Sequence, residues 1–497
     1  MKRQIKDPLG HRIKKQRNHC IACAIAAALL CLLCACGGQA SLRQDANAPD
    51  RPGTEGENAL SAETPGPAAA SGSDLIPLSQ ETDKGRYTVG QTTDPESTND
   101  LLCYIDYDLA QEIPLCAQPS CSHDSDACTA FVESGKKAMA PQTGDGGAIF
   151  FKMENEEIEE ADGSLQEEIW AADADGSNRR LLVRSMTGSG GYSPVAEDDT
   201  FLYYFYGFTR EGNGGTPERG QRLARVPLAG GESEDVFSWD DSGAGVGYEF
   251  WGVSGREVAV YRCDWGGSFG IDAPLSEIDA AIDAQGEQRL PQMARHSVLL
   301  VHIDTGMQRE LDAWDSAFGS AGRYCLWENG RLYWCADSVY GPIHWLDADG
   351  QSGELAALPE KSNDENAVYT LDRIVQGRLL VNIRSPETGS VSRCAIELSD
   401  ESADEPADGG SAGSAIPLTL RYLQGTSEHP VPIEGQGETG ILVMYEEGME
   451  QSTGFHEDGT VKNGLSVTMR YGMISYEVFF ASRPNYRPVE MTYGFMG

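Results

Sequence analysis

The amino-acid sequence predicts an all-β protein built from a repeated unit. Short stretches alternate apolar and polar residues, as strands with one buried face do; 201–206 and 378–383 are examples. Turns rich in Gly, Asp and Asn separate these stretches, and the chain holds 57 glycines. Similar turns recur at intervals of about 50 residues, widened in places by insertions. The clearest pair reads Asp-Ala-Asp-Gly, at 173–176 and at 347–350.

Each copy of the turn follows a strand candidate, which makes the repeat a set of antiparallel hairpins. Repeats of this length form radial arrays, so we expect a β-propeller of six to seven four-stranded blades. No regular alternation of strands with helices is visible, which opposes a doubly wound fold. The predicted strands include 148–153, 201–206, 258–262, 331–334, 378–383, 441–445 and 476–480.

One turn predicts strand register in detail. Asn329 and Gly330 both accept the positive φ that a two-residue type I′ hairpin requires. With these residues at the tip, Cys325 and Cys335 are not opposite each other and lie on opposite faces of the hairpin. We therefore expect no simple disulfide between them.

The first 35 residues are predicted to be a lipoprotein signal peptide rather than part of the fold. A basic leader precedes an apolar run from Cys20 to Cys34, which is shorter than the roughly 20 residues that span a bilayer as a helix. The segment Leu33-Cys34-Ala35-Cys36 resembles the lipobox of bacterial lipoproteins. The resemblance implies that Cys36 is the lipidation site, carrying palmitate-type acyl chains. The alternative is an ordinary secretory peptide that is cut nearby.

The rest of the chain divides into a tether and one large domain. Residues 36–82 are rich in Ala, Ser, Gly, Pro, Asp and Glu, so we expect a lipidated flexible linker there. The propeller is expected over 83–497, with insertions near 266–296 and 400–415. Within the first insertion, Leu275, Ile278 and Ile282 share one face of a predicted short helix.

Charge limits the kind of partner. The chain has 38 Lys+Arg against 77 Asp+Glu, a formal net charge of −39. Nucleic-acid binding requires clustered cations, so we expect no nucleic-acid partner. The predicted partners are the membrane, reached through the N-terminal lipid, and an unknown extracellular protein, peptide or glycan.

Cys116, Cys121, His123 and Cys128 form the pattern C-x4-C-x-H-x4-C. Three thiolates and one imidazole would complete a tetrahedral site for a structural Zn²⁺. Outside the cytosol, however, oxidising conditions favour disulfides, so we expect disulfide pairing among these cysteines ahead of a metal site. The third possibility is that the cysteines are free thiols without a role. Beyond structural zinc we expect no cofactor.

The Asp pairs of the repeated turns are a further candidate for metal binding. Asp173 and Asp175, like Asp347 and Asp349, could supply Ca²⁺ ligands. An EF-hand-type loop aligned on either turn would end at Leu182 or Ala356, where a bidentate Glu is required. We therefore interpret these residues as turn-forming Asp that hydrogen-bond to their own backbone.

Residues from about 87 to the end resemble the TolB-like and DUF5050-type β-propellers of lipoproteins from Gram-positive, clostridia-like bacteria. The resemblance is carried by the Asp-Ala-Asp-Gly turns and by the stretch 113–128. It implies a propeller held on the outer face of the cell membrane, and it supplies no catalytic residues. We therefore expect a binding or scaffolding module rather than an enzyme. The alternative is a surface hydrolase or lyase acting on glycan or peptide, with carboxylates at the propeller mouth.

Overall fold

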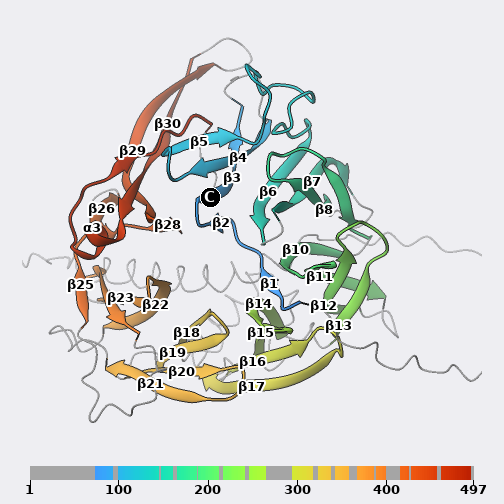
Figure 1. Ribbon diagram of the computed structural model, residues 1–497, viewed down its shortest axis with the longest axis vertical. Coiled ribbons are helices and arrows are strands. Elements are labelled where there is room, and N and C mark those ends of the chain that lie inside the picture. Colours follow the sequence, from blue (N-terminus) through green and yellow to red (C-terminus); the bar gives the residue numbers. More distant parts are fainter. Residues whose placement is uncertain are drawn as a thin grey trace, which may run out of the picture.

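Seven four-stranded antiparallel sheets form a ring in the described part of the computed structural model (Figure 1). The sheets follow one another around the ring in chain order, as the blades of a propeller do. The predicted β-propeller is thus confirmed, and the number of blades is seven. The described residues are 73–92, 99–144, 147–159, 165–186, 189–211, 217–240, 246–264, 294–316, 323–336, 342–357, 367–385, 388–398, 415–424, 427–455 and 461–493.

Within each blade the strands run in chain order from the centre of the ring to its rim. The first blade comprises β2 (Glu81–Thr82), β3 (Gly85–Gln91), β4 (Asp100–Asp106) and β5 (Gln111–Pro114). The second comprises β6 (Lys136–Thr143), β7 (Ala148–Glu159), β8 (Leu165–Asp173) and β9 (Arg180–Arg184). The third comprises β10 (Ser189–Glu197), β11 (Phe201–Glu211), β12 (Pro217–Pro227) and β13 (Glu234–Trp239), with β1 (Ile76–Pro77) added at its inner edge.

The other four blades repeat this arrangement. The fourth comprises β14 (Val246–Ser254), β15 (Glu257–Asp264), β16 (Ala294–His302) and β17 (Met307–Ser316). The fifth comprises β18 (Arg323–Glu328), β19 (Arg331–Ala336), β20 (Pro342–Asp347) and β21 (Ser352–Ala357). The sixth comprises β22 (Val368–Val375), β23 (Arg378–Arg384), β24 (Val391–Glu397) and β25 (Ile416–Leu418). A hairpin of β26 (Arg421–Gln424) and β27 (Ser427–Pro430) leads to the seventh: β28 (Ile433–Gln436), β29 (Gly440–Phe455), β30 (Val461–Ser475) and β31 (Arg487–Pro488).

Apolar side chains fill every junction between neighbouring blades. Phe205 of the third blade and Val260 of the fourth belong to one buried cluster, for example. A single larger cluster joins the sixth, seventh and first blades through Leu380, Leu442 and Ile105, each of which is fully buried. Burial of this apolar area, worth about 25 cal/mol per Å², stabilises the ring as one continuous structure.

The ring is closed by the C-terminal segment. Val489 donates its backbone N–H to Tyr471 of β30 (2.8 Å), which ties the segment to the seventh blade. Glu490 then forms a parallel bridge with Gln111 and exchanges hydrogen bonds of 2.9 Å with Ala110 and Glu112 at the rim of the first blade. One short stretch of chain therefore joins the last blade to the first.

Residues 73–82, which we expected to belong to the tether, are part of the fold. Ile76 and Pro77 pair with β10, and Ser79 forms a bridge with Thr143 at the end of β6. The segment thus crosses the ends of the innermost strands before it enters the first blade (Figure 1). Leu75 is buried with residues of the third and fourth blades, and backbone hydrogen bonds hold the rest of the stretch. The long run of small and polar residues before it led us to assign this short apolar segment to the tether.

Turn chemistry sets the local register as predicted. Asn329 and Gly330 adopt φ of 50° and 72°, and Glu328 pairs with Arg331. Cys325 consequently lies opposite Trp334, and Cys335 lies opposite Tyr324.

The repeated acidic turns are also held as predicted. Ser177 donates its backbone N–H to Asp175 Oδ1 (3.0 Å), and Gln351 donates its N–H to Asp347 Oδ1 (2.8 Å). Both carboxylates are thus engaged by the backbone of their own turns.

One predicted strand is wrong. Tyr476–Phe480 forms the short helix α3 instead of a strand. Tyr476, Val478 and Phe480 alternate as in a strand, but β30 ends at Ser475 and the chain must turn back toward β31. A helical turn achieves this and buries Phe479, which is 1% exposed.

Several predictions concern residues outside the described ranges. They are the signal peptide, the lipidated Cys36, the tether as far as residue 72, the helix within 272–282 and the insertion 400–414. The end of the other insertion is described, and there Ala294 already begins β16. Among the described residues no helix is both long and apolar enough to cross a membrane.

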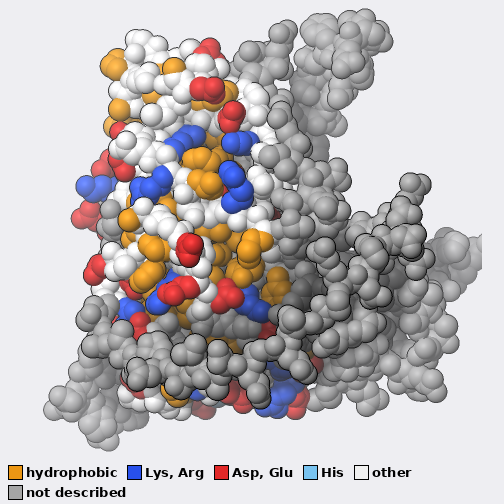
Figure 2. Space-filling model, turned by 90° about the vertical axis from the view of Figure 1, so that its right-hand side faces the viewer, with side chains coloured by type: hydrophobic (Ala, Val, Ile, Leu, Met, Phe, Trp, Pro, Cys, Tyr) orange, Lys and Arg blue, Asp and Glu red, His pale blue; other side chains and the backbone are white. Residues whose placement is uncertain are grey.

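Charged groups of both signs are interspersed on the described part of one side of the ring. Figure 2 shows one side of the ring, where Lys and Arg side chains alternate with Asp and Glu among apolar groups. The described part of this side carries no broad area of a single sign.

Candidate functional site

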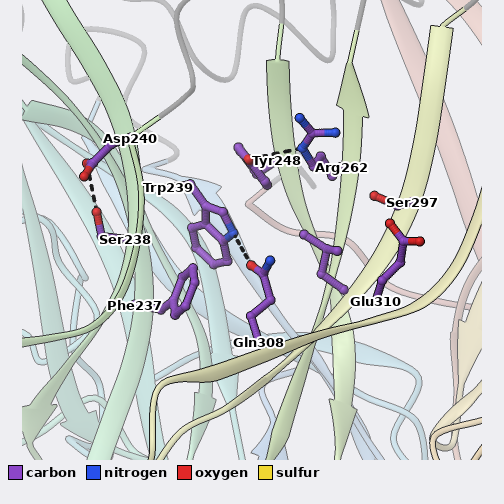
Figure 3. A pocket seen from close by; sticks show the side chains of 10 residues that line it. Phe237, Ser238, Trp239, Asp240, Tyr248, Arg262, Ser297, Gln308 and Glu310 are labelled. Carbon is purple, nitrogen blue, oxygen red and sulfur yellow. Dashed lines mark hydrogen bonds between the residues drawn. The ribbon is translucent and has the colours of Figure 1, made fainter.

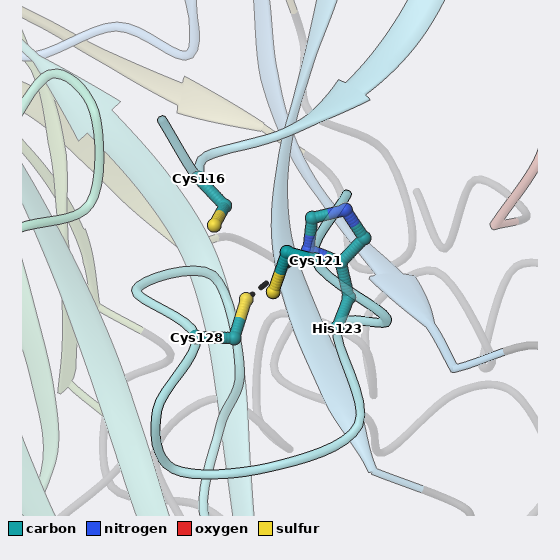
Figure 4. Close-up of side chains that lie close together, drawn as sticks. All are labelled: Cys116, Cys121, His123 and Cys128. Atoms are coloured by element: carbon teal, nitrogen blue, oxygen red, sulfur yellow. Dashed lines mark hydrogen bonds between the residues drawn. The ribbon is translucent and has the colours of Figure 1, made fainter. Parts of the chain in front are cut away.

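The loop between β5 and β6 brings the predicted Cys and His residues together. The three Sγ atoms of Cys116, Cys121 and Cys128 and a ring nitrogen of His123 all lie within 4.8 Å of one another. Figure 4 shows the four side chains pointing toward a common centre. His123 Nδ1 lies 3.2 Å from Cys128 Sγ. The loop connects the first blade to the second.

Backbone conformation places two of these donors. Ser120 and His123 adopt φ of 59° and 57°, in the left-handed region that residues with a side chain occupy at a cost. These two residues flank Cys121, and together they fold the chain so that Cys121 and His123 both face Cys128. Hydrogen bonds from Cys121 N to Gln118 O and from Cys128 N to Ser125 O close the two local turns.

The electrostatic surroundings differ between the thiols. Partial burial raises the pKa of Cys116, but hydrogen bonds from the Gln118 backbone and from Cys128 outweigh it, so the net pKa is lowered. Burial raises the pKa of Cys128 to about 12, although the backbone N–H of Ala130, 3.4 Å from its Sγ, opposes the shift. The guanidinium of Arg179 acts on Cys128 electrostatically and also donates to the carbonyl oxygens of Thr129 and Phe131. Cys116 therefore forms a thiolate more readily than Cys128 does.

These residues fit a tetrahedral metal ion. With Zn–S bonds of about 2.3 Å, tetrahedral sulfur ligands are roughly 3.8 Å apart, so only small adjustments are needed from the observed spacing. The eight described cysteines are free thiols in this structure, and disulfide pairing within this loop stays a prediction.

A second candidate site lies between the third and fourth blades. It is an open cleft of about 550 Å³, lined by residues of β13 through β17 and by Asp240. Phe237 and Trp239 have ring centroids 4.9 Å apart, and Trp239 and Tyr248 have centroids 5.1 Å apart. Figure 3 shows Phe237 and Trp239 on the side of the cleft that the third blade provides, with Tyr248 of the fourth blade next to Trp239. Trp239 is only 4% exposed, whereas Phe237 is half-buried.

Polar groups line the same cleft. Trp239 Nε1 donates to Gln308 Oε1 at 2.8 Å, and Arg262 Nε donates to Tyr248 Oη at 3.3 Å. Two carboxylates, those of Asp240 and Glu310, are 60% and 50% exposed. Because β13 and β17 belong to different blades, the sequence alone could not bring these residues together.

The carboxylates with raised pKa values lie elsewhere. Burial raises the pKa of Glu328, an effect that Arg373 opposes and Glu81 reinforces. Surrounding protein atoms also raise the pKa of Glu249. Neither residue lines the cleft. A hydrolase or lyase brings acids with perturbed pKa values together on bound substrate, and these two acids lie outside the cleft.

The sequence carries no signal for a buried relay in the fourth blade. Ser316 Oγ lies 2.6 Å from His296 Nε2, and His296 Nδ1 lies 2.5 Å from Tyr261 Oη. The three residues resemble a nucleophile, a base and an orienting group, but His296 and Ser316 are only 1% and 3% exposed. They stand on separate strands, and their spacing in the sequence forms no recognisable motif. Such burial identifies a hydrogen-bonded core network rather than a site of reaction.

The chain has distant structural neighbours but no match among protein families or curated sequences. No protein-family model matches the chain, and no curated protein matches its sequence. Among solved structures, it is similar to an oligogalacturonate lyase in complex with manganese, with a TM-score of 0.35, 12% identity and coverage of 78% of this chain and 85% of that one. It is also similar to a xylan β-1,4-xylosidase from Bacillus halodurans C-125, with a TM-score of 0.20, 9% identity and coverage of 69% and 88%. Similarity at these TM-scores carries no argument about chemistry.

Proposed function

We propose that this protein is a lipid-anchored, extracytoplasmic propeller that binds a neutral glycan in the cleft between its third and fourth blades. The proposed location rests on the basic leader, the apolar run and the lipobox-like segment that ends at Cys36. A diacylated Cys36 would hold the chain firmly, because two acyl chains anchor where one binds only marginally. The resemblance to TolB-like and DUF5050-type lipoproteins supports the same proposal.

The lining of the cleft is the observation that carries the choice of ligand. Sugars present C–H faces that pack on aromatic rings and hydroxyl edges that bond to planar polar side chains. Phe237 offers a half-buried ring, while Gln308 and Arg262 offer a carboxamide and a guanidinium beside it. The exposed carboxylates of Asp240 and Glu310 can accept hydrogen bonds from hydroxyl groups and would repel an anionic sugar. A neutral glycan could pack on the ring of Phe237 and form hydrogen bonds with these polar and charged side chains.

Binding is favoured over catalysis by the positions of the acids. Asp240 is held by Arg222 at 2.8 Å and Ser238 at 2.9 Å, and Glu310 faces Arg295 at 3.5 Å. Both carboxylates thus have cationic partners that position them to accept hydrogen bonds. A glycan hydrolase would instead need one of its acids to keep a proton.

A glycan array tests this proposal directly. The full chain, purified in detergent, is applied to neutral and charged oligosaccharides from bacterial and plant cell walls. We expect retention on neutral glycans, about tenfold weaker for Gln308→Ala and for Phe237→Ala because each removes one contact. Gln424→Ala, which removes an exposed carboxamide from β26 in the hairpin that leads to the seventh blade, is the matched control. Retention of peptides without any glycan would overturn the proposal.

A further inference from the structure

We infer that Cys116, Cys121, His123 and Cys128 bind one structural Zn²⁺, and that this ion fastens the C-terminal segment that closes the propeller ring. The inference is independent of the proposed glycan site, which lies between the third and fourth blades. It concerns how the first and last blades are held together.

The donor set selects zinc. Three thiolates and one imidazole are typical ligands of tetrahedral Zn²⁺, and four protein ligands leave no open position for a substrate. Binding would release three thiol protons to solvent, so the bound site would carry one net negative charge. Arg179 lies close enough to Cys128 to stabilise that charge, and the N–H of Ala130 points at Cys128 Sγ from 3.4 Å. Partners of this kind orient and tune metal ligands in proteins.

Geometry favours the metal over a disulfide. Three thiols can form only one disulfide, which would leave the third sulfur and the converging imidazole without a role. His123 holds a left-handed φ of 57° while its ring nitrogen lies 3.2 Å from Cys128 Sγ. A coordinate bond to His123 would offset the cost of that backbone conformation.

The same imidazole contacts the closing segment. The ring of Tyr493 meets the His123 ring edge-on, with centroids 6.1 Å apart. Tyr493 donates its N–H to Glu112 Oε2 (2.7 Å), and its carbonyl oxygen accepts the N–H of Gln91 (2.8 Å). Three residues earlier, Glu490 pairs with the rim of the first blade. An ion that fixes His123 therefore also fixes the surface against which the segment packs.

Metal content and amide exchange test the two halves of the inference. The full chain, purified under reducing conditions, should contain about one zinc per molecule by elemental analysis. Co²⁺ in place of zinc should give thiolate-to-cobalt charge-transfer bands and the d–d bands of a tetrahedral site. Chelation should speed amide exchange of 489–493 by about tenfold, while exchange in β15 and β16 stays unchanged.

Variants provide the controls. Cys121→Ser should lose the zinc and show the same faster exchange, whereas Cys394→Ser, which alters a buried thiol of the sixth blade, should keep both properties of the wild type. The cobalt spectrum of the wild-type chain tests the site even if Cys121→Ser does not fold. The absence of zinc together with a disulfide among the three cysteines would overturn the inference. Zinc whose removal leaves exchange of 489–493 unchanged would overturn its role in ring closure.

Discussion

Gly252 of β14 faces the indole of Trp327 of β18 so closely that no side chain fits between them. A Cβ atom at Gly252 would lie 2.3 Å from Cδ1 of Trp327 and 2.7 Å from its Nε1. Trp327 is 8% exposed, and its Nε1 donates to Val253 O at 3.3 Å. The contact joins the fourth and fifth blades, so its tightness limits how the two blades pack.

Replacing this glycine should therefore weaken the ring. We expect Gly252→Ala to lower the free energy of unfolding by about 1–3 kcal/mol, because the buried indole has to move. Gly247→Ala in the same strand is the control, since a Cβ there meets nothing within 4 Å. Urea denaturation followed by Trp fluorescence measures both. Equal stability of the two variants would contradict this account of the junction.

The buried relay in the fourth blade predicts sensitivity to acid. Burial lowers the pKa of His296 below its ordinary value, an effect that Asp315 opposes. The unfolded chain then takes up a proton as the pH falls through about 6.5, while the folded chain resists it, so folding stability is lost below that pH. We expect a loss of about 1 kcal/mol between pH 7.5 and 5.5 that His296→Gln abolishes. His302→Gln, which changes a more exposed ring, should keep the wild-type dependence; if all three proteins lose the same amount, the relay does not account for it.

Arg256 holds the N-terminal segment against the ring. It forms two hydrogen bonds of 2.6 Å with Asp304, reaches Asp198 at 3.5 Å and donates to the backbone oxygen of Ser73. Asp198 is 5% exposed, so removing the cation leaves a buried carboxylate with fewer partners.

Arg256→Ala should therefore destabilise the fold by about 2 kcal/mol and expose the segment around Ser73 to proteases. Arg256→Lys should restore part of the loss, because it keeps the charge but not the bidentate geometry. Thermal denaturation and limited proteolysis check both variants. Unchanged protease resistance near Ser73 would show that the segment is held by other contacts.

Membrane anchorage is expected to depend on one cysteine. Cys36→Ser should prevent acylation and release the chain from the membrane, whereas Cys34→Ser, two residues earlier, should leave acylation intact. Metabolic labelling with an alkyne fatty acid and detergent-phase partitioning measure these outcomes. Labelling that persists in Cys36→Ser would contradict the assignment of the lipidated residue.

Much of the architecture could be predicted from local patterns. Alternation identified most strands, and the positive φ accepted by Asn329 and Gly330 set one hairpin register correctly. Both signals act within a few residues of the chain. The strand predicted at Tyr476–Phe480 failed because alternation in five residues does not report that the chain must reverse there.

Contacts between distant segments could not be predicted. The spacing of Cys116, Cys121, His123 and Cys128 indicated that they could meet, because all four belong to one loop. Nothing in the sequence indicated that Tyr493 would pack against His123, or that Gln308 would bond to Trp239 across two blades. Such contacts depend on the number of blades and on how the ring closes, and the repeat period left the blade number at six or seven.

The interblade cleft is proposed to hold a glycan without altering it. Isothermal titration of the full chain with a neutral oligosaccharide, followed by mass spectrometry of the recovered sugar, tests this claim most directly. We predict saturable binding that weakens in Gln308→Ala, and recovery of the sugar at its original mass. Shortened or unsaturated products that disappear in Glu310→Gln would contradict the account and identify the cleft as an active site.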